Sequence, residues 1–342
     1  MLLTLFRGLM ILVGMDVVGC LGCDPLAGRR DPPGGIIALT TSWVVSHVVG
    51  PMNLGTLIVG PREHVVAVAD LDEDAAARNS APSCVNRGSV NGPVRCSAPG
   101  GVVRVGDTVR RPAGPWTPAV HALLTHLHGA GFGAAPRPLG IDERGREILT
   151  FIHGAPAWPD GFRLLDGNER LAQATRLIRE FHDAVATFIP PPDPHWQVLI
   201  PADGSEIIAH HDLAPWNLII GGPQWAFIDW DLAAPGTRLW DLAYAIHGFV
   251  PLTANPGYQR QDTSRRLRLM ADTYGLSQQQ RLDIIPLLAR RTAAQHAFLA
   301  REAARGTEPW TRLWHEGHGD AWRADTDYIV QHGTQWRQAL LG

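Results

Sequence analysis

The alternation of hydrophobic and polar residues becomes regular only after about residue 99. Two short apolar runs there flank the dipeptide Gly106-Asp107, which is the pattern of a β-hairpin. A helix is predicted over 118–128, where apolar side chains recur every three or four positions. The strand candidates are 102–105, 108–111, 135–142 and 146–152. Hairpin, helix and two further strands predict a small α+β domain over 97–153.

Beyond a linker at 153–161 that is rich in proline and glycine, the pattern changes to that of long helices. A helix is predicted over 168–188 from its apolar stripe. One polar loop between two strand-like runs interrupts this region at 207–220, and 259–342 is predicted to be helical with an arginine-rich outer face. Residues 154–342 are therefore predicted to form a second, larger and mainly helical domain.

Residues 1–96 carry no clear periodicity apart from short apolar runs. They are predicted to be a poorly patterned extension, and the sequence leaves open whether they are native to the domain that follows. The first 23 residues resemble a secretion signal, but Arg7 is their only basic residue and Asp16 interrupts the apolar run. That run is also shorter than the ~20 residues of a membrane helix. We therefore expect a cytoplasmic protein that does not bind a membrane.

Composition narrows the classes of function. The chain has 342 residues, 45% hydrophobic and 18% charged, with a net charge of −3, which is typical of a globular protein and gives no reason to expect a nucleic-acid partner. All thirty basic residues are arginine. A Walker A phosphate loop, which requires lysine, is thereby excluded. Any role that commonly falls to lysine must here fall to arginine or go unfilled.

The most informative stretch is IIAHHDLAPWNLII at 207–220, which places four polar side chains between two apolar runs. Unpartnered buried polar groups cost roughly 1–3 kcal/mol each, so such a loop needs a reason. A short strand is predicted at 225–228, as the hairpin partner of the run at 218–220. The polar loop then lies at the mouth of this hairpin, and Asp229 lies at the end of the partner strand. We therefore expect Asp212, Asn217 and Asp229 to lie close to one another.

His210, Asp212 and Asn217 match the H-x-D-x-x-x-x-N catalytic loop of kinases. The IDWD tetrapeptide that contains Asp229 follows where that fold has its metal-binding aspartate. The full motif, HxDLxPxN followed by IDWDxAxPGxxxxDLA, resembles that of the aminoglycoside phosphotransferase family, which is related to choline kinases. The resemblance covers about 98–250. It implies an α+β, bilobal protein-kinase-like fold with a small β-rich N-lobe and a larger, mainly helical C-lobe.

The same resemblance implies a small-molecule kinase, which moves the γ-phosphate of ATP or GTP to a hydroxyl group. Asp212 would be the catalytic base, and His210 would hold the catalytic loop by hydrogen bonds. Asn217 and Asp229 would supply the hard oxygen ligands that Mg²⁺ prefers.

The acceptor implied by the family is aminoglycoside-, choline- or sugar-like. It would bind between the catalytic loop and the helical tail. Glu302 and Glu316 in that tail are candidates for meeting a cationic acceptor. The sequence does not indicate an oligomeric state.

The small domain departs from the family pattern at its nucleotide-binding residues. Gly100-Gly101 is a reduced glycine-rich loop, and the strand before it is not recognisable. In place of the strand lysine stands Arg110, or alternatively Arg111, because hairpin alternation alone does not say which one faces the nucleotide. Arginine would bind phosphate through a planar fork rather than a point charge.

The helix that follows offers no glutamate partner for this arginine, because no acidic residue occurs between 112 and 141; His121 lies on roughly the corresponding face. A catalytically weak or silent kinase-like domain that binds nucleotide or a small molecule therefore remains an alternative. A metal-dependent phosphohydrolase with His210, His211 and Asp212 as ligands is disfavoured, because strands rather than helices flank the motif.

Overall fold

The computed structural model describes residues 9–10, 36–39, 43–47, 57–61, 96–98, 101–159, 162–222 and 224–342. The chain divides into two compact units, Met1–Gly88 and Ser89–Gly342. The first contains a four-stranded sheet in the order β1-β4-β3-β2. Its strands are β1 (Leu9–Met10), β2 (Ile36–Leu39), β3 (Trp43–His47) and β4 (Leu57–Pro61). Most of the predicted extension, 1–96, lies outside the described residues, as does Gly100.

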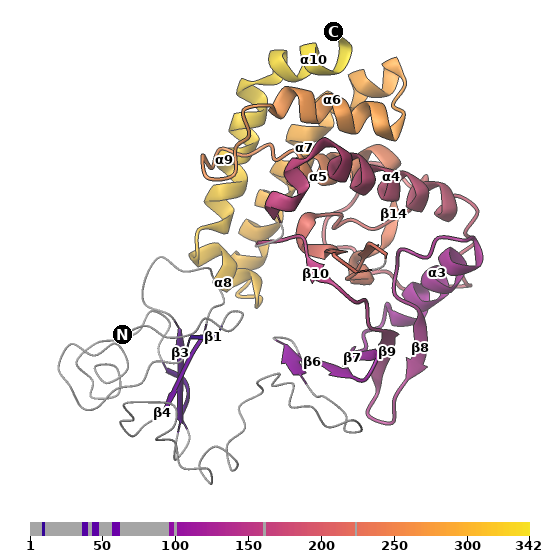
Figure 1. The fold of residues 1–342 in the computed structure, drawn as a ribbon, viewed down its shortest axis with the longest axis vertical. Helices are drawn as coiled ribbons and strands as arrows, with labels where there is room; N and C mark the ends of the chain where they lie inside the picture. Colours follow the sequence, from indigo (N-terminus) through magenta and orange to yellow (C-terminus); the bar gives the residue numbers. More distant parts are fainter. Residues whose placement is uncertain are drawn as a thin grey trace, which may run out of the picture. The chain divides into compact units, whose positions relative to one another are not determined.

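The second unit begins with a small β-rich lobe. Its five strands form an antiparallel sheet in the order β5-β6-β7-β9-β8, and one helix, α3, lies beside that sheet (Figure 1). The elements are β5 (Cys96–Ala98), β6 (Val102–Val105), β7 (Thr108–Pro112), α3 (Thr117–Gly129), β8 (Pro138–Ile141) and β9 (Arg146–Thr150). The predicted hairpin is β6–β7, with Val105 paired to Thr108 across the turn. β5 is the strand that the sequence pattern does not reveal.

The apolar stripe predicted for the helix is its buried face. Val120, Leu123, Leu124 and Leu127 are all at most 1% exposed in α3, which confirms the helical spacing. Thr117 accepts a hydrogen bond from the amide of Gly114, 2.9 Å away, rather than capping the helix.

The rest of the unit is a larger, mainly helical lobe (Figure 1). Its helices are α4 (Asn168–Val185), α5 (Arg238–Phe249), α6 (Thr263–Tyr274), α7 (Gln278–Ala304), α8 (Trp310–His315), α9 (His318–Gln331) and α10 (Gly333–Leu341). Its short strands are β10 (Ala155–Pro156), β11 (Ile207–Ala209), β12 (Leu218–Ile220), β13 (Ala226–Phe227) and β14 (Ala234–Gly236). This arrangement confirms the predicted α+β fold with a small β-rich lobe and a larger helical one.

The short strands carry the loops of the candidate site, and a buried aromatic group fixes them to the helical core. Trp230 is 1% exposed and packs edge-on against Phe181 of α4, with ring centroids 4.9 Å apart. Its indole nitrogen donates a hydrogen bond to the carbonyl of Phe227, 3.0 Å away. The loop after β13 is therefore held against α4 by packing and by a satisfied polar contact.

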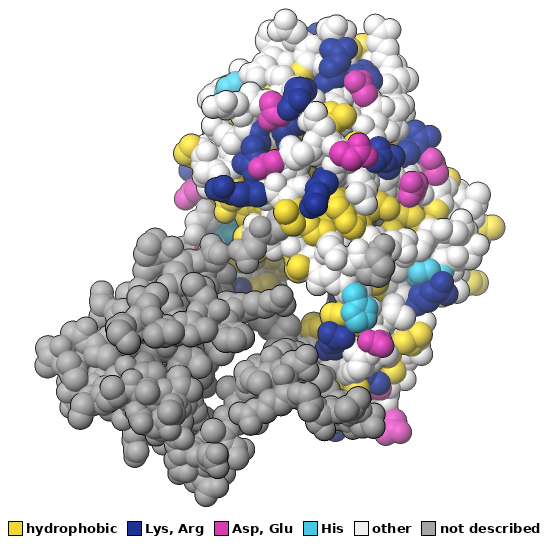
Figure 2. All heavy atoms as spheres, viewed as in Figure 1, with side chains coloured by type: hydrophobic (Ala, Val, Ile, Leu, Met, Phe, Trp, Pro, Cys, Tyr) yellow, Lys and Arg dark blue, Asp and Glu magenta, His cyan; other side chains and the backbone are white. Residues whose placement is uncertain are grey.

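On the face shown in Figure 2, arginine and acidic side chains are interspersed over the helical lobe. Within the described residues, every helix is too short or too polar to cross a membrane.

Candidate active site

The catalytic-loop motif lies between β11 and β12, and the strand that follows brings its two halves together. β12 and β13 are antiparallel, with Leu218 opposite Phe227, and the amide of Ile228 donates to the carbonyl of Asn217 at 2.9 Å. Asp229 therefore follows directly beside Asn217. The Asn217 side-chain nitrogen also donates to Asp212 Oδ2 at 2.8 Å. The structure thus brings together the three side chains that the sequence places up to seventeen residues apart.

Two residues of these loops have left-handed backbone conformations that favour glycine. His211 has φ of 65° and Asp229 has φ of 63°. Such a conformation costs of order 1–3 kcal/mol for a residue with a side chain, and it persists only where surrounding contacts enforce it. Both strained residues lie at the candidate site, one beside Asp212 and the other in the IDWD tetrapeptide.

Asp241 at the start of α5 supplies such contacts to His211. It is fully buried, and its two carboxylate oxygens accept the backbone amides of His210 at 2.9 Å and of His211 at 2.8 Å. The ring of His182 lies 3.2 Å away. Burial opposes ionisation, but the hydrogen bond and charge of His182, with electrostatic attraction to His211 and His210, lower the pKa of Asp241 to about 2. A buried carboxylate thus holds the catalytic loop from below.

His210 is buried beneath the loop with both ring nitrogens engaged. The amide of Asp212 lies 3.3 Å from its Nδ1, and the carbonyl of Ile228 lies 3.2 Å from its Nε2. One neutral tautomer, with the proton on Nε2, satisfies both contacts. Its ring also packs against Trp230, with centroids 4.5 Å apart. These contacts let His210 tie the catalytic loop to the strand that leads to Asp229.

The carboxylate of Asp212 lies in an environment that favours its protonated form. Burial raises its pKa above the ordinary aspartate value of 3.8, and the negative charge of Asp229 adds to this effect. Electrostatic attraction to the His210 ring and hydrogen bonds from Tyr244 and Asn217 act in the opposite direction but do not overcome it. A raised pKa makes a carboxylate a better proton acceptor once it is ionised.

One arginine of the small lobe reaches across to the acidic residues after β13. Arg111 Nη1 lies 2.9 Å from Asp229 Oδ1, and Nη2 lies 2.6 Å from Asp231 Oδ1. Arg110 lies on the opposite face of β7, where it donates to Thr108 Oγ1 at 2.8 Å and lies 3.7 Å from Asp142. The structure therefore directs Arg111, and not Arg110, toward the acidic residues that follow β13.

Glu147 is the acidic partner that the sequence analysis missed. It stands directly opposite Arg111 in the β7–β9 register, is 1% exposed, and forms an ion pair with Arg111 Nε. Its second oxygen lies 2.9 Å from the ring of His121 on α3. The acidic partner of Arg111 therefore comes from strand β9 and not from helix α3. The helix instead provides His121, which contacts Glu147. A glutamate at an inward-facing position of a short strand is the signal that could have revealed it.

Replacing Glu147 with glutamine should lower the free energy of unfolding by about 1.5–3 kcal/mol, because the change removes a buried charge from its ion pair with Arg111 and its hydrogen bond with His121. Urea denaturation of the variant measures this, with Glu143→Gln on the exposed turn of the same lobe as the control. A loss no larger than that of the control would contradict the assignment.

Gly101 is the described member of the predicted glycine pair. It lies in the turn before β6, with φ of 79°, a conformation that glycine adopts without strain. A Cβ atom at this position would lie 3.7 Å from the ring of Pro112, which is an ordinary contact distance, so backbone conformation rather than space is what favours glycine. Gly101 is therefore placed at the start of the hairpin that carries Arg111.

The donor set beside Arg111 fits a magnesium ion. The Asn217 nitrogen is used by Asp212, so its amide oxygen is left for a ligand, and Asp229 and Asp231 add carboxylate oxygens at a partly exposed position. These are hard oxygen ligands. No group of three or more His, Cys, Asp or Glu residues within the described ranges forms a metal site by itself. An ion here would need further oxygens, such as those of phosphates, and a histidine-based phosphohydrolase centre finds no support.

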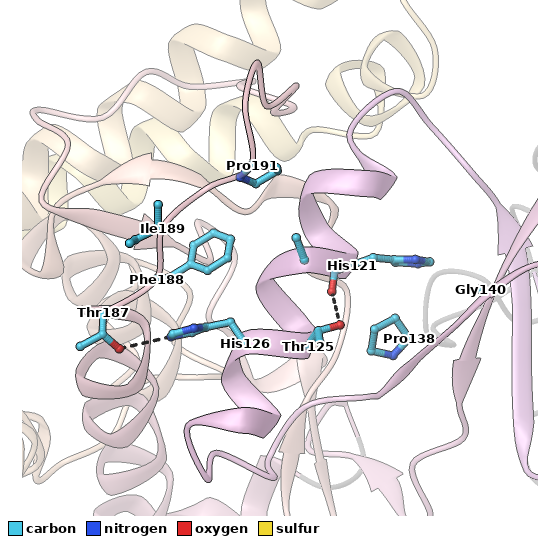
Figure 3. Close-up of a pocket in the computed structure, with 10 residues that line it drawn as sticks. His121, Thr125, His126, Pro138, Gly140, Thr187, Phe188, Ile189 and Pro191 are labelled. Carbon is cyan, nitrogen blue, oxygen red and sulfur yellow. Dashed lines mark hydrogen bonds between the residues drawn. The ribbon is translucent and has the colours of Figure 1, made fainter.

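Two cavities flank these elements. One of about 260 Å³ lies between the catalytic loop and the helical tail, and Asp212 lines it. A wider, open groove of about 700 Å³ lies along α3 and includes 187–191; Figure 3 shows the ring of His126 directed to Thr187 across it. His121 borders this groove, but its ring is bound to Glu147. Asp212, Asn217 and Asp229 do not line the groove, so the smaller cavity is the one joined to the candidate site.

Comparison with known proteins places this geometry in a family. Residues 193–275, which include the catalytic loop and Asp241, match the model of the phosphotransferase enzyme family. The trifolitoxin immunity protein of Rhizobium leguminosarum bv. trifolii is 33% identical over 257 residues, which cover 70% of this chain and 94% of that protein.

Solved structures of low sequence identity also match. A microcompartment-associated aminopropanol kinase is 12% identical with a TM-score of 0.48, covering 70% of this chain and 90% of that one. The GDP complex of aminoglycoside 2'-phosphotransferase-IIIa is 13% identical with a TM-score of 0.47, covering 74% and 96%. A choline/ethanolamine kinase family protein from Mesorhizobium loti is 14% identical with a TM-score of 0.46, covering 69% and 89%.

The family match falls on the segment that carries the catalytic-loop motif, and the curated relative matches over nearly its whole length. The chain therefore belongs to the phosphotransferase enzyme family, as the resemblance to aminoglycoside phosphotransferases and choline kinases predicts.

Proposed function

We propose that this protein transfers the γ-phosphate of a nucleoside triphosphate, ATP or GTP, to a hydroxyl group of a small molecule. The observation that carries the proposal is the convergence of Asp212 and Asn217 with the acidic pair Asp229 and Asp231, opposite Arg111. Phosphoryl transfer requires positioning and charge neutralisation more than covalent chemistry from the protein, and this set of residues supplies both.

In the proposed reaction, the Asp212 carboxylate orients the acceptor hydroxyl and accepts its proton. The hydroxyl oxygen forms a bond to the γ-phosphorus as the bond from that phosphorus to the β-phosphate oxygen breaks, and the nucleoside diphosphate leaves. Asn217 holds the Asp212 carboxylate by its 2.8 Å hydrogen bond, so the base keeps one orientation. Asp241 holds the same loop through its backbone amides.

Arg111 is proposed to bind the nucleotide phosphates. Its guanidinium now donates to Asp229 and Asp231, and phosphate oxygens would replace one or both of these acceptors in a bidentate contact. Asn217 and Asp229 would hold Mg²⁺, which neutralises phosphate charge when bound. Glu147 keeps Arg111 extended toward the site through the ion pair with Nε.

The decisive experiment measures release of ADP or GDP by the full chain with Mg²⁺ while hydroxyl-bearing metabolites and antibiotics are screened as acceptors. At least one acceptor should stimulate release and gain a phosphate detectable by mass spectrometry. Nucleotide hydrolysis that no acceptor stimulates, or no Mg²⁺-dependent nucleotide binding at all, would count against the proposal.

Replacing Asp229 with asparagine should weaken Mg²⁺-dependent ATP or GTP binding at least about tenfold, because one hard anionic ligand is lost. Titration calorimetry with and without Mg²⁺ separates this from a direct effect on the nucleotide, since binding without the ion should change little. Asp327→Asn, an exposed position on α9, is the matched control. Equal weakening with and without Mg²⁺ would remove Asp229 from the metal site.

A second candidate is a nucleotide-binding domain without transferase activity. Arg111 favours it, because the guanidinium bridges the carboxylates of Asp229 and Asp231 and must release Asp229 before a cation can bind there. Nucleotide binding without phosphorylation of any acceptor in the screen would select this candidate.

The curated relative suggests a biological setting. Its name describes immunity to trifolitoxin. Phosphorylation of a toxic small molecule, or its capture without phosphorylation, would each provide protection, and we propose protection of this kind as the role to test first in cells.

A further inference from the structure

The cavity beside Asp212 lies between the catalytic loop and the helical tail, where the resemblance to the family leads us to expect the acceptor. It measures about 260 Å³, just below the roughly 300–1,000 Å³ of common small-molecule sites, so its ligand must be compact. Its walls come from the segment 197–200, the catalytic loop, Leu232 and Ala234 after β13, and the helices α5, α7 and α8. Aromatic and aliphatic side chains make up most of them: Trp216, Leu232, Tyr244, Phe298, Trp310 and Leu313.

Arg291 of α7 lines this cavity and is 3% exposed. It donates to the carbonyl of His211 at 3.0 Å and to Gln295 Oε1 at 3.2 Å, and its guanidinium lies over the ring of Tyr244, 4.2 Å from the centroid. Its Nε has no acceptor. No carboxylate among the described residues lies within ion-pair distance of it, and the two acidic groups that attract it, Asp212 and Asp241, do so at longer range. Arg291 is therefore a buried cation at this cavity without a direct ion-pair partner.

Two further side chains that line this cavity carry polar atoms that lack partners. They are His211 Nδ1 and Gln197 Oε1. Seven buried side-chain atoms in the described part of the chain have no hydrogen-bond partner, and three of the seven belong to side chains that line this one cavity. The other four are Arg111 Nε and Glu147 Oε1, which face each other in an ion pair, and Trp240 Nε1 and His247 Nδ1. Unsatisfied buried groups that gather at one cavity indicate a ligand that would satisfy them.

The acidic residues expected to receive a cationic acceptor lie elsewhere. Glu302 is paired with Arg301 at 2.9 Å and with Arg305 at 3.2 Å, and Glu316 is paired with Arg312 at 2.8 Å. Neither residue lines the cavity, whose one acidic side chain among the described residues is Asp212. The charge available for recognition beyond the catalytic base is therefore positive.

We propose that the acceptor is a compact, mainly apolar or aromatic alcohol that carries a carboxylate or similar oxyanion, which Arg291 binds while Asp212 meets the hydroxyl. This inference rests on the proposed phosphotransferase function and adds the chemical class of the substrate. The aromatic walls bury the body of the ligand, the guanidinium of Arg291 donates to the oxyanion, and Gln197 and His211 offer further polar contacts.

Three probes on one scaffold test the charge preference: 4-(hydroxymethyl)benzoate, its neutral amide, and 4-(aminomethyl)benzyl alcohol as the cation. Titration calorimetry with the full chain, with and without Mg²⁺ and a non-hydrolysable ATP analogue, measures binding without requiring catalysis. The anion should bind at least about tenfold more tightly than the amide, and the cation most weakly. Tightest binding of the cation, or no binding of any probe at millimolar concentration, would overturn the proposal.

Substitutions of Arg291 test whether this side chain causes the preference for the anionic probe. Arg291→Met should reduce the anion's advantage over the amide to under about threefold, and Arg291→Lys should keep part of it. Arg290→Met is the matched control, because Arg290 is the neighbouring residue on α7 but pairs with Asp203 outside the cavity. An anion preference that survives Arg291→Met in a folded variant would also overturn the proposal.

Val198→Asp tests the same charge preference without altering the buried core, since Val198 lines the cavity but is 52% exposed. The new carboxylate should weaken binding of the anionic probe and strengthen binding of the cationic probe by about tenfold each.

The proposed enzymatic function and the proposed substrate class can fail separately. Selective anion binding without any phosphoryl transfer would contradict the enzymatic function alone, and transfer only to cationic acceptors would contradict the substrate class alone.

Discussion

Replacing Asp212 with asparagine should lower kcat for phosphoryl transfer by about 10²–10⁴ while the protein stays folded, because general base assistance of this kind contributes that much to rate. Asparagine keeps the shape of the side chain and one oxygen for the hydrogen bond from Asn217, but it cannot accept the hydroxyl proton. Single-turnover measurements with saturating Mg²⁺ and nucleotide test this, since nucleotide affinity should change little. A loss below tenfold would mean that Asp212 is not the base.

The dependence of kcat on pH gives an independent check on the same residue. Only ionised Asp212 can accept a proton, and burial raises its pKa above 3.8, so activity should fall as the pH falls through this raised value. The acid limb of the profile should therefore lie above the range of an ordinary aspartate. The residual activity of Asp212→Asn should lack that limb, whereas the exposed control Asp327→Asn should retain it.

The catalytic loop could be predicted from sequence because its geometry is local. Asp212 and Asn217 are five residues apart in a loop between two strands, and the next strand places Asp229 beside them through the pairing of Leu218 with Phe227. Each step depends on chain connectivity over a short distance. The role of Asp241 as an anchor depends on a longer contact, but a charged residue at the start of a hydrophobic helix was a usable signal.

The small lobe could not be predicted to the same depth, because its key contacts depend on the pairing of distant strands. Hairpin alternation puts Arg110 and Arg111 on opposite faces but does not say which face meets the larger lobe. The partner Glu147 lies thirty-six residues beyond Arg111, and only the β7–β9 register brings the two together. Similarly, Arg291 meets the catalytic loop at His211 across eighty residues. Such contacts follow from tertiary packing and leave no periodic signal.

Replacing Asp241 with asparagine should lower the free energy of unfolding by about 3–5 kcal/mol, the loss expected when one partner of a buried charged contact is removed. Asparagine would present an N–H group to one of the two backbone amides that the carboxylate now accepts, from His210 and His211. One donor would remain buried and unpaired, and the strained backbone of His211 would lose a contact that enforces it. Urea denaturation at neutral pH measures this effect. Asp183→Asn is the matched control, since Asp183 makes two ion pairs but is half exposed, and should cost no more than about 1 kcal/mol.

The stability difference between the wild type and Asp241→Asn should also depend on pH in a defined direction. The pKa of Asp241 is lowered from 3.8 to about 2 in the folded protein, so its ionisation stabilises the fold above pH 3.8, and this contribution is lost as the pH falls toward 2. At 1.36 kcal/mol per pH unit, the shift corresponds to about 2.5 kcal/mol. The variant has no such group to protonate, so its deficit should shrink by about that amount across this window. A deficit that stays constant between pH 4 and pH 2 would mean that the charge of Asp241 contributes nothing, and that its hydrogen-bonding shape alone holds the catalytic loop.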